Sequence, residues 1–369
     1  MHLTEPGSVS AALRARVDAA IAASGGCLPF DRFMAIALYE PGLGYYANAS
    51  RKFGWMPSSG SDFVTAPELS PLFGAALSRQ LLQALEASGT DEIWEFGAGS
   101  GALAAQLLEA LGARLRRYVI VDVSGALRER QQERLAAHAG RVEWVDALPD
   151  VIRGVIVGNE VLDAMPVQLL HFDGQTWRER GVSVDGSALG WCDRETALRP
   201  PFDGPFAPGA VVEIHAQAEA FVATLADRLQ CGAAFFIDYG FPDAEFYHPQ
   251  RSAGTLMCHR AHQADGDPLV NLGEKDITAH VNFSGIALAG QDAGLDVIGY
   301  TTQAHFLINC GLLELLEGAG PRVVAPAQTL LAEHEMGELF KVVGFAKGLP
   351  ASFCANAMGF TAGDRLHTL

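Results

Sequence analysis

The chain has 369 residues, of which 49% are hydrophobic and 19% are charged, so it can form a large core and is neither a disordered protein nor a coiled coil. Its formal net charge of −17 argues against a nucleic-acid-binding surface, which requires basic patches. We expect no signal peptide and no membrane span, because Met1 to Ser10 is polar and no run approaches ~20 apolar residues.

Six cysteines are scattered along the chain without a C-x-x-C pair, so the sequence does not support a zinc site or dithiol chemistry. They stand at Cys27, Cys192, Cys231, Cys258, Cys310 and Cys354. We therefore expect reduced, partly buried thiols in a cytosolic protein.

Three helices are predicted before any strand. Apolar residues recur at four-residue steps over Ser8–Ala23, a second helix spans Pro29–Tyr39, and a long third helix spans Glu68–Ala87. Thr65, with Glu68 three residues later, is typical of a capping box at the start of the third helix.

Strands and helices then alternate, which is typical of a doubly wound α/β sheet. Strands are predicted at 92–96, 118–122, 142–145, 155–158, 233–238, 296–300 and 341–346, with helices at 102–111, 125–138 and 214–229. This order predicts a Rossmann-like sheet of seven strands whose last strand is antiparallel. We expect a helical N-terminal cap over residues 1–90 and a core over residues 91–369, with insertions at about 167–210 and 241–280.

The two insertions have different patterns. Val167–Val184 alternates and turns at Asp173-Gly174, which predicts a β-hairpin. Phe241–Lys275 follows a strand at the carboxyl edge of the sheet, where ligands bind. We interpret it either as a lid or substrate loop or as a solvated surface loop.

The segment Ile93–Leu103 runs from an apolar strand through glycines at alternate positions into a helix. Glycine allows the backbone to approach a ligand closely, and a helix N-terminus favours negative charge. Glu95 precedes the first glycine, and Asp122 ends the next strand. The loop itself contains Gly97, Ala98, Gly99 and Gly101. This is the layout of a nucleotide-type cofactor site at the carboxyl edge of a parallel sheet.

The glycine pattern alone does not separate nicotinamide cofactors from S-adenosylmethionine (SAM). Glu95 favours SAM, because a carboxylate suits a cationic amino-acid end and lies awkwardly near a pyrophosphate. No tyrosine has a lysine four residues later, so a nicotinamide oxidoreductase lacks its usual Tyr-x-x-x-Lys pair. A glycine turn without a ligand is the remaining alternative.

Acidic residues also follow two later strands. The fourth strand is followed by Asn159, Glu160 and Asp163. Two converging carboxylates suit a cation such as a guanidinium. Helix capping is the alternative explanation of these residues. Asp238 and Tyr239 end the fifth strand, where they either line a substrate pocket or form a turn.

His280 is a candidate general base, because imidazole titrates near neutrality. It is one of eleven histidines, so this assignment rests on residue type alone. No H-x-x-x-H pair, G-x-S-x-G elbow or G-x-x-x-x-G-K loop occurs, and zinc proteases, α/β-hydrolases and P-loop enzymes therefore have no support.

Several segments together resemble one family. They are Phe33–Tyr46 (FMAIALYEPGLGYY), Asp62–Phe73 (DFVTAPELSPLF), Glu95–Gly101 (EFGAGSG), Asn159–Pro166 (NEVLDAMP), Ile237–Gly240 (IDYG), Tyr247–Leu256 (YHPQRSAGTL) and Asp276–Phe283 (DITAHVNF). The chain resembles, over nearly its whole length, the MidA-like family of bacterial and mitochondrial SAM-dependent methyltransferases, which includes a complex I assembly factor that methylates protein arginine.

The resemblance implies a class I SAM-methyltransferase fold with SAM as cofactor, and we expect no metal because the cysteines lack a metal-binding spacing. It implies transfer to a protein arginine, with a protein substrate such as a complex I subunit, and it is compatible with a homodimer. A non-catalytic SAM-binding assembly protein is the alternative. We expect cofactor-binding residues at Asp62, Thr65, Glu68, Glu95, Gly97, Ala98, Gly99, Gly101, Asp122, Val123, Asp146 and Asn159. We expect catalytic residues at Glu160, Asp163, Asp238, Tyr239 and His280.

Overall fold

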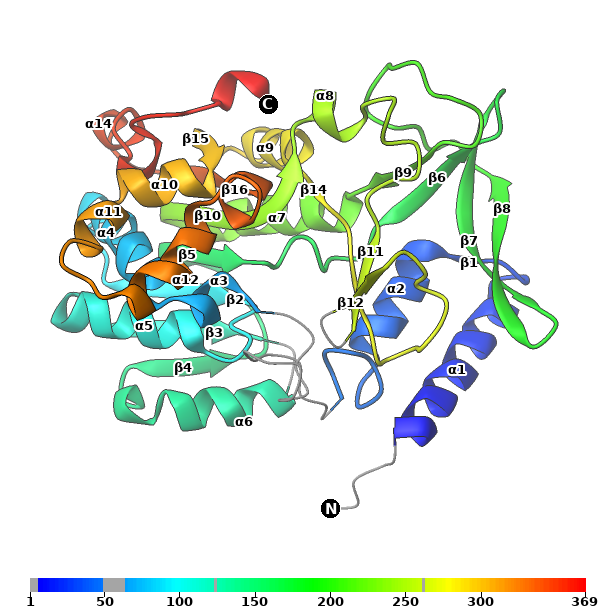
Figure 1. Ribbon diagram of the computed structural model, residues 1–369, viewed down its shortest axis with the longest axis horizontal. Coiled ribbons are helices and arrows are strands. Elements are labelled where there is room, and N and C mark those ends of the chain that lie inside the picture. Colours follow the sequence, from blue (N-terminus) through cyan, green and yellow to red (C-terminus); the bar gives the residue numbers. More distant parts are fainter. Residues whose placement is uncertain (1–5, 49–63, 123–124, 261–262) are drawn as a thin grey trace.

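The computed structural model describes residues 6–48, 64–122, 125–260 and 263–369, and it has a mixed α/β architecture (Figure 1). The main sheet has the strand order β15-β16-β10-β5-β2-β3-β4, and β14 pairs with β10 off this path. These strands are β2 (Glu92–Phe96), β3 (Arg117–Val121), β4 (Val142–Val145), β5 (Ile152–Asn159), β10 (Leu229–Phe241), β14 (Val281–Asn282), β15 (Asp296–Thr302) and β16 (Phe340–Lys347). The sheet therefore has eight strands in the described residues, where the sequence predicted seven, because the two-residue β14 carries no periodicity.

The pairing follows the predicted alternation. Strands β4, β3, β2, β5 and β10 are mutually parallel, and β16 is antiparallel to both β10 and β15. Parallel strands covered on both faces are apolar along their length, as the buried runs of β5 and β10 are. Strand β10 extends beyond the predicted 233–238 at both ends, so that Tyr239 and Gly240 still belong to it.

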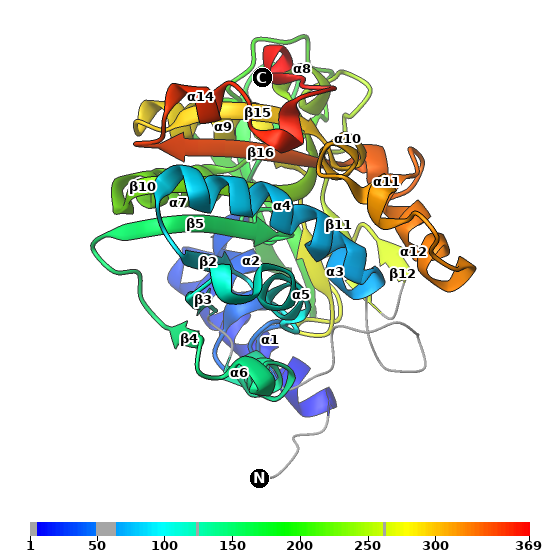
Figure 2. The same ribbon diagram turned by 90° about the vertical axis from the view of Figure 1, so that its left-hand side faces the viewer.

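Helices cover both faces of the main sheet. Apolar residues of α4 (Pro71–Ser88) and α5 (Ala102–Leu111) pack on one face, and those of α7 (Ala216–Arg228) and α9 (Phe283–Asp292) pack on the other. Figure 2 shows α4 and α5 in front of the sheet. The carboxyl ends of the parallel strands are thereby left as the open edge, where a ligand can bind. After α5 the chain also forms the helices α6 (Gly125–Arg134), α8 (Asp243–Phe246), α10 (Gln303–Asn309), α11 (Leu312–Leu315), α12 (Pro321–Leu331), α13 (Met336–Leu339) and α14 (Ala351–Cys354).

The long helix predicted at 68–87 is wrong at its start. Two helices occur there, α3 (Ala66–Leu69) and α4, and they are separated at Ser70. Ser70 has extended backbone angles because Pro71 disfavours the helical conformation of the residue before it. The Ser70 side chain then accepts a hydrogen bond from the N–H of Leu72 and caps α4.

A second apolar cluster lies outside the main sheet. Helices α1 (Pro6–Ala23) and α2 (Phe30–Tyr39), with β1 (Leu28–Pro29) between them, pack against a five-stranded sheet that we call the second sheet. Its other strands are β6 (Gln168–Phe172), β7 (Trp177–Asp185), β8 (Ala188–Glu195) and β9 (Val211–Ile214). We call α1, β1 and α2 the N-terminal unit. The predicted cap over residues 1–90 is therefore divided, because α4 packs on the main sheet.

The predicted hairpin is confirmed, since Phe172 pairs with Trp177 across the turn at Asp173-Gly174. The second insertion contributes a small third sheet, made of β11 (Met257–Arg260), β12 (Gln263–Asp265) and β13 (Asp276–Thr278). In the described part of the chain, no helix is long and apolar enough to cross a membrane.

The expectation of reduced cysteines is wrong for one pair. Cys27 and Cys192 form a disulfide with Cα atoms 6.0 Å apart, which joins the N-terminal unit to β8. Their separation of 165 residues hid this contact from any reading of the sequence. The other four cysteines are free.

Candidate active site

A cavity of about 1260 Å³ lies at the carboxyl ends of the parallel strands. The loops after β2, β3 and β5 and the end of β10 form one side, while the N-terminal unit and the third sheet form the other. No Lys or Arg of the described residues lines it. Six carboxylates do, namely Glu95, Asp122, Asp146, Glu160, Asp163 and Asp276. This charge pattern favours a cationic ligand.

The glycine loop has the predicted geometry. Gly97, Gly99 and Gly101 have φ angles of 63°, 53° and 78°, in the left-handed region that favours glycine. A Cβ atom at Gly97 would lie 2.9 Å from Cγ2 of Val161, so the backbone approaches the acidic loop closely. Gly97, Ala98 and Gly99 line the cavity, whereas Gly101 lies behind it as the N-cap of α5.

Glu95 is the predicted acid before the glycines, and it lines the cavity with only 3% of its surface exposed. Its Oε2 accepts a hydrogen bond of 2.8 Å from the hydroxyl of Tyr118. Burial raises the pKa of Glu95 to about 8, and the charge of Asp122 adds to this effect. A buried carboxylate without a cation in the described residues around it fits the amino end of an amino-acid-type cofactor.

Asp122 and Asp146 also line the cavity, at the ends of β3 and β4. Sequence reasoning missed the residue that holds Asp122, because Gln131 lies in a polar helical run with no motif. The side-chain amide of Gln131, fully buried, donates to Oδ2 of Asp122 at 2.8 Å and to the carbonyl of Gly99 at 3.0 Å. Its own oxygen accepts from Nε1 of Trp144 at 2.9 Å. Asp146 pairs with Arg128.

Of the two described site residues predicted before α4, one lines the cavity and the other does not. Thr65 lines the cavity and precedes α3, but its side chain makes no capping bond, so the expected capping box does not form. Glu68 does not line the cavity and instead accepts hydrogen bonds from Ser100 and Arg134. The assignments of Asp62 and Val123 fall outside the described residues.

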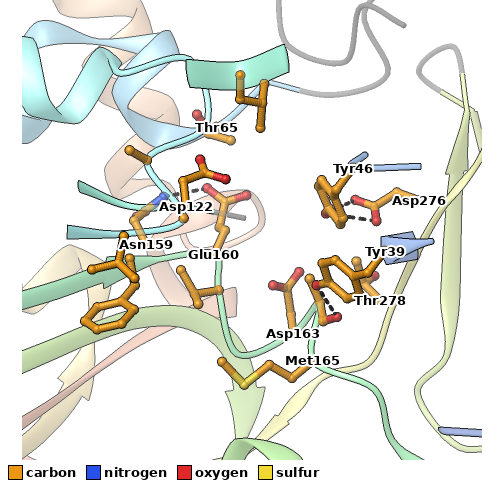
Figure 3. Close-up of a pocket in the computed structure, with 18 of the residues that line it drawn as sticks. Tyr39, Tyr46, Thr65, Asp122, Asn159, Glu160, Asp163, Met165, Asp276 and Thr278 are labelled. Carbon is orange, nitrogen blue, oxygen red and sulfur yellow. Dashed lines mark hydrogen bonds between the residues drawn. The ribbon is translucent and has the colours of Figure 1, made fainter. Parts of the chain in front are cut away.

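The acidic loop after β5 contains Asn159, Glu160 and Asp163, which all line the cavity (Figure 3). Glu160 has a φ angle of 55°, which is unusual for a residue with a side chain. The amide of Asn159 donates to Oε1 of Glu160 at 2.9 Å. Oδ1 of Asn159 and Oδ1 of Asp163 are buried and have no hydrogen-bond partner among the described residues, so both are acceptors open to a donor.

The predicted catalytic residue Asp238 does not line the cavity but lies beneath this loop, fully buried. Its Oδ2 accepts hydrogen bonds from the N–H groups of the three residues after Glu160, at 3.1, 2.9 and 3.2 Å. Three converging N–H groups thereby tie the loop that carries the acids to Asp238. Asp238 belongs to strand β10, so the turn that the sequence offered as an alternative does not form at this residue.

Tyr239 and His280, which the sequence assigned as catalytic, both line the cavity. The hydroxyl of Tyr239 donates to Oδ2 of Asp163 at 2.5 Å. His280 stacks on Phe241 with ring centroids 5.3 Å apart and an interplanar angle of 10°. Burial, with the positive charge of Arg251, lowers the pKa of His280 to about 4. The general-base assignment of His280 stays a prediction.

The cluster of acids has raised pKa values. Burial raises the pKa of Glu160 to about 8, with the charge of Asp163 second, while bonds from Asn159 and the N–H of Ala66 oppose the shift. Burial likewise raises the pKa of Asp163 to about 6, against the bond from Tyr239. A cation placed between these acids would reverse both effects by favouring the charged forms.

Three further residues on the far side of the cavity were not assigned from the sequence, although two of the family-like segments contain them. They are Tyr39, Tyr46 and Asp276. The Tyr39 hydroxyl donates to the carbonyl of Ala164 at 2.8 Å. The Tyr46 hydroxyl lies 2.9 and 2.8 Å from the two carboxylate oxygens of Asp276. Figure 3 shows Asp122 and Asn159 on one side, Tyr46 and Asp276 on the other, and Glu160 and Asp163 between them.

The second insertion reaches the cavity through Met257 and His259 of β11. In the chain as described, no group of three or more His, Cys, Asp or Glu residues could hold a metal ion.

Known proteins resemble the chain in sequence and in structure. A family model described as "putative S-adenosyl-L-methionine-dependent methyltransferase" matches residues 76–301. Protein arginine methyltransferase NDUFAF7, mitochondrial, from Danio rerio is 27% identical over 362 residues, which cover 86% of this chain and 82% of that protein. The Mus musculus protein of the same name is 28% identical over 368 residues, with 86% and 80% covered.

Two solved structures are also similar. A Burkholderia thailandensis protein bound to S-adenosyl-homocysteine is 49% identical, with a TM-score of 0.93 and 100% of both chains covered. A native structure of a protein from the same organism is 48% identical, with a TM-score of 0.89 and the same coverage. The cavity thus belongs to a fold that has been solved with this cofactor product in a similar protein.

Proposed function

Because the chain belongs to a family of SAM-dependent methyltransferases, whose model covers residues 76–301, we propose that it methylates arginine side chains of a protein. The names of the curated relatives, which are protein arginine methyltransferases, support this substrate. The observation that carries the proposal is the pair of buried acceptors, Oδ1 of Asn159 and Oδ1 of Asp163, which have no hydrogen-bond partner in the described part of the chain. Oxygen atoms that can accept hydrogen bonds suit a guanidinium, because this cation carries several N–H donors.

The described residues fit SAM on physical grounds. The left-handed glycines Gly97 and Gly99 bring backbone without a side chain to the cavity wall, and Glu95 offers a buried carboxylate to an ammonium group. Asp122, oriented by Gln131, suits the hydroxyl groups of a ribose. SAM supplies an electrophilic methyl group on a sulfonium centre. We propose that Thr65 and Asp146 complete this half of the site.

The acidic loop would act on the arginine. A guanidinium carries one positive charge and no free lone pair, so each methyl group that it accepts requires the loss of one proton. Glu160 and Asp163 would hold the guanidinium by charge-assisted bonds, concentrate its charge on one nitrogen and free the lone pair of another. The same carboxylates are the groups placed to receive the released proton, and alignment with the methyl group supplies the remaining catalysis.

The substrate protein itself is a finer proposal. The resemblance to the MidA-like family leads us to propose a subunit of respiratory complex I, and a homodimer stays a prediction. The curated relatives are named as mitochondrial proteins. The expected cytosolic location rested on reduced thiols, and the Cys27–Cys192 disulfide removes that support.

The test begins with calorimetric titration of the whole chain with S-adenosyl-homocysteine and, separately, NADH. We expect micromolar binding of the first and none of the second, and Gly97→Val should abolish binding because its Cβ would lie 2.9 Å from Val161. A second assay follows methylarginine by mass spectrometry after incubation with SAM and basic proteins. Glu160→Gln combined with Asp163→Asn should keep cofactor binding and lose transfer.

Each alternative has its own signature in these assays. Binding of NADH alone would contradict the methyltransferase assignment. Cofactor binding without transfer to any protein would favour the non-catalytic assembly protein. Full transfer by the double variant would remove the proposed role of the acidic loop.

A further inference from the structure

Part of the far side of the cavity is built by an N-terminal segment outside the matched family region of residues 76–301. Tyr39 ends α2, and Tyr46 follows seven residues later in the N-terminal segment. Both rings line the cavity and both remain partly exposed there. Both residues lie across the cavity from Asp122 and Asn159 (Figure 3).

The two rings pack against each other at the cavity wall. They stack with centroids 5.6 Å apart and an interplanar angle of 21°, and Tyr45 braces Tyr46 edge-on at 5.0 Å. Tyr39 and Tyr46 also pack against the apolar cluster of the N-terminal unit. The bond from the Tyr39 hydroxyl to the carbonyl of Ala164 fixes this ring relative to the acidic loop, since Ala164 follows Asp163 directly.

Burial and the negative charge of nearby Asp276 and Asp163 raise the pKa of Tyr39 above its ordinary value, so its hydroxyl stays protonated and remains a donor. The ring is therefore neutral, and its π-face carries partial negative charge toward any cation beside it. Acids and aromatic faces together surround a space without any lining Lys or Arg among the described residues.

We propose that Tyr39 and Tyr46 form an aromatic wall that selects a planar guanidinium over a primary ammonium in the acceptor half of the cavity. A guanidinium is planar and weakly hydrated. It can stack on an aromatic ring while the N–H groups along its edge donate hydrogen bonds to a carboxylate. An ammonium is a compact, strongly hydrated point charge that loses more hydration on an aromatic surface. The inference rests on the proposed function, because it assigns selectivity within the same site.

The experiment measures selectivity by calorimetry on the whole chain saturated with S-adenosyl-homocysteine. The probes are N-acetyl-arginine methylamide and N-acetyl-lysine methylamide, which share a backbone and differ in the cationic group. We expect the arginine probe to bind more tightly, and Tyr39→Leu to lower the ratio of the two affinities by about fivefold to thirtyfold. Tyr39→Phe keeps the ring face and should keep most of that ratio.

A matched control comes from the same helix. Phe33 is fully buried and does not line the cavity, so Phe33→Leu should lower stability without changing the ratio. The proposal is overturned if Tyr39→Leu leaves the ratio unchanged or changes it no more than Phe33→Leu does. It is also overturned if the unaltered chain binds both probes equally.

Failure of this inference is distinguishable from failure of the proposed function. If the chain forms methylarginine but Tyr39→Leu leaves the ratio of the two probe affinities unchanged, the aromatic wall is rejected and the proposed methyltransferase activity stands. If selectivity for the arginine probe depends on the Tyr39 ring but no tested protein gains methylarginine, the aromatic wall stands and arginine methylation is rejected.

Discussion

Gln131 holds Asp122 in place across the cofactor side of the cavity. Its amide donates to Oδ2 of Asp122 at 2.8 Å while the carbonyl of Gly99 takes the second hydrogen at 3.0 Å. One buried side chain thus couples the glycine loop after β2 to the acid after β3, so these two parts of the proposed cofactor site cannot move independently.

We expect Gln131→Leu to weaken binding of S-adenosyl-homocysteine by about tenfold to a hundredfold, because bonds to a charged group and to a buried carbonyl are both lost. Calorimetric titration measures this change. Gln80→Leu is the matched control, since Gln80 is equally buried but lies outside the cavity. Equal effects of the two substitutions would show that Gln131 contributes to general stability only.

Asp238 should control the shape of the acidic loop rather than the chemistry. Asp238→Ala leaves three backbone N–H groups without their acceptor, and we expect methyl transfer to fall about tenfold or more with a marked loss of stability. Asp238→Asn keeps an acceptor oxygen and should retain more transfer. The measurements are kcat, KM and the free energy of unfolding.

Glu213→Gln provides the control for Asp238. Glu213 is another buried carboxylate that accepts two backbone N–H groups, but it lies outside the cavity. We expect Glu213→Gln to lower the free energy of unfolding and to leave kcat of the folded enzyme unchanged. A loss of kcat in this variant equal to that of Asp238→Ala would argue against a specific positioning role.

The pH dependence of stability should reflect Glu160. Its folded-state pKa of about 8 lies above its ordinary value of 4.5, so the folded chain binds this proton more tightly than the unfolded chain. Its stabilising contribution is complete below the ordinary value and is lost as the pH rises through about 8. We expect the free energy of unfolding of the ligand-free protein to decrease from about pH 5 to about pH 8. Urea titrations should show a smaller decrease for Glu160→Gln.

The same ionisation should favour substrate binding at higher pH. A cationic arginine probe should bind more tightly as Glu160 and Asp163 lose their protons, between about pH 6 and about pH 8. Calorimetry in two buffers of different ionisation enthalpy should detect proton release on binding. Binding that is independent of pH in the unaltered chain would contradict this account.

The Cys27–Cys192 disulfide should stabilise the N-terminal unit. Because it closes a loop of 165 residues, its reduction should cost about 3–5 kcal/mol of stability, while cofactor affinity changes little. Thermal unfolding with and without a reductant measures the loss, and Cys27→Ser should make the protein insensitive to the reductant. Cys231→Ala, at a free cysteine, should leave the response to reductant intact.

The sequence predicted the elements whose cause is local. The helix at 102–111 and the strand at 92–96 have the predicted bounds, because glycine and apolar periodicity define them within one segment. The break at Ser70 was missed, although Pro71 carried the signal. Strand β14 and the Cys27–Cys192 bond depend on contacts between distant segments, so no local pattern contained them.

The sequence by itself determined the glycine loop, the acids at the strand ends and the family to which they point, because these are motifs of fixed spacing at the ends of parallel strands. Only the tertiary structure decided what each acid faces. It turned Asp238 and Glu68 away from the cavity and brought Gln131 to Asp122. It also brought Tyr39 beside the acidic loop, since side-chain direction and long-range packing are properties of the folded chain rather than of any one segment.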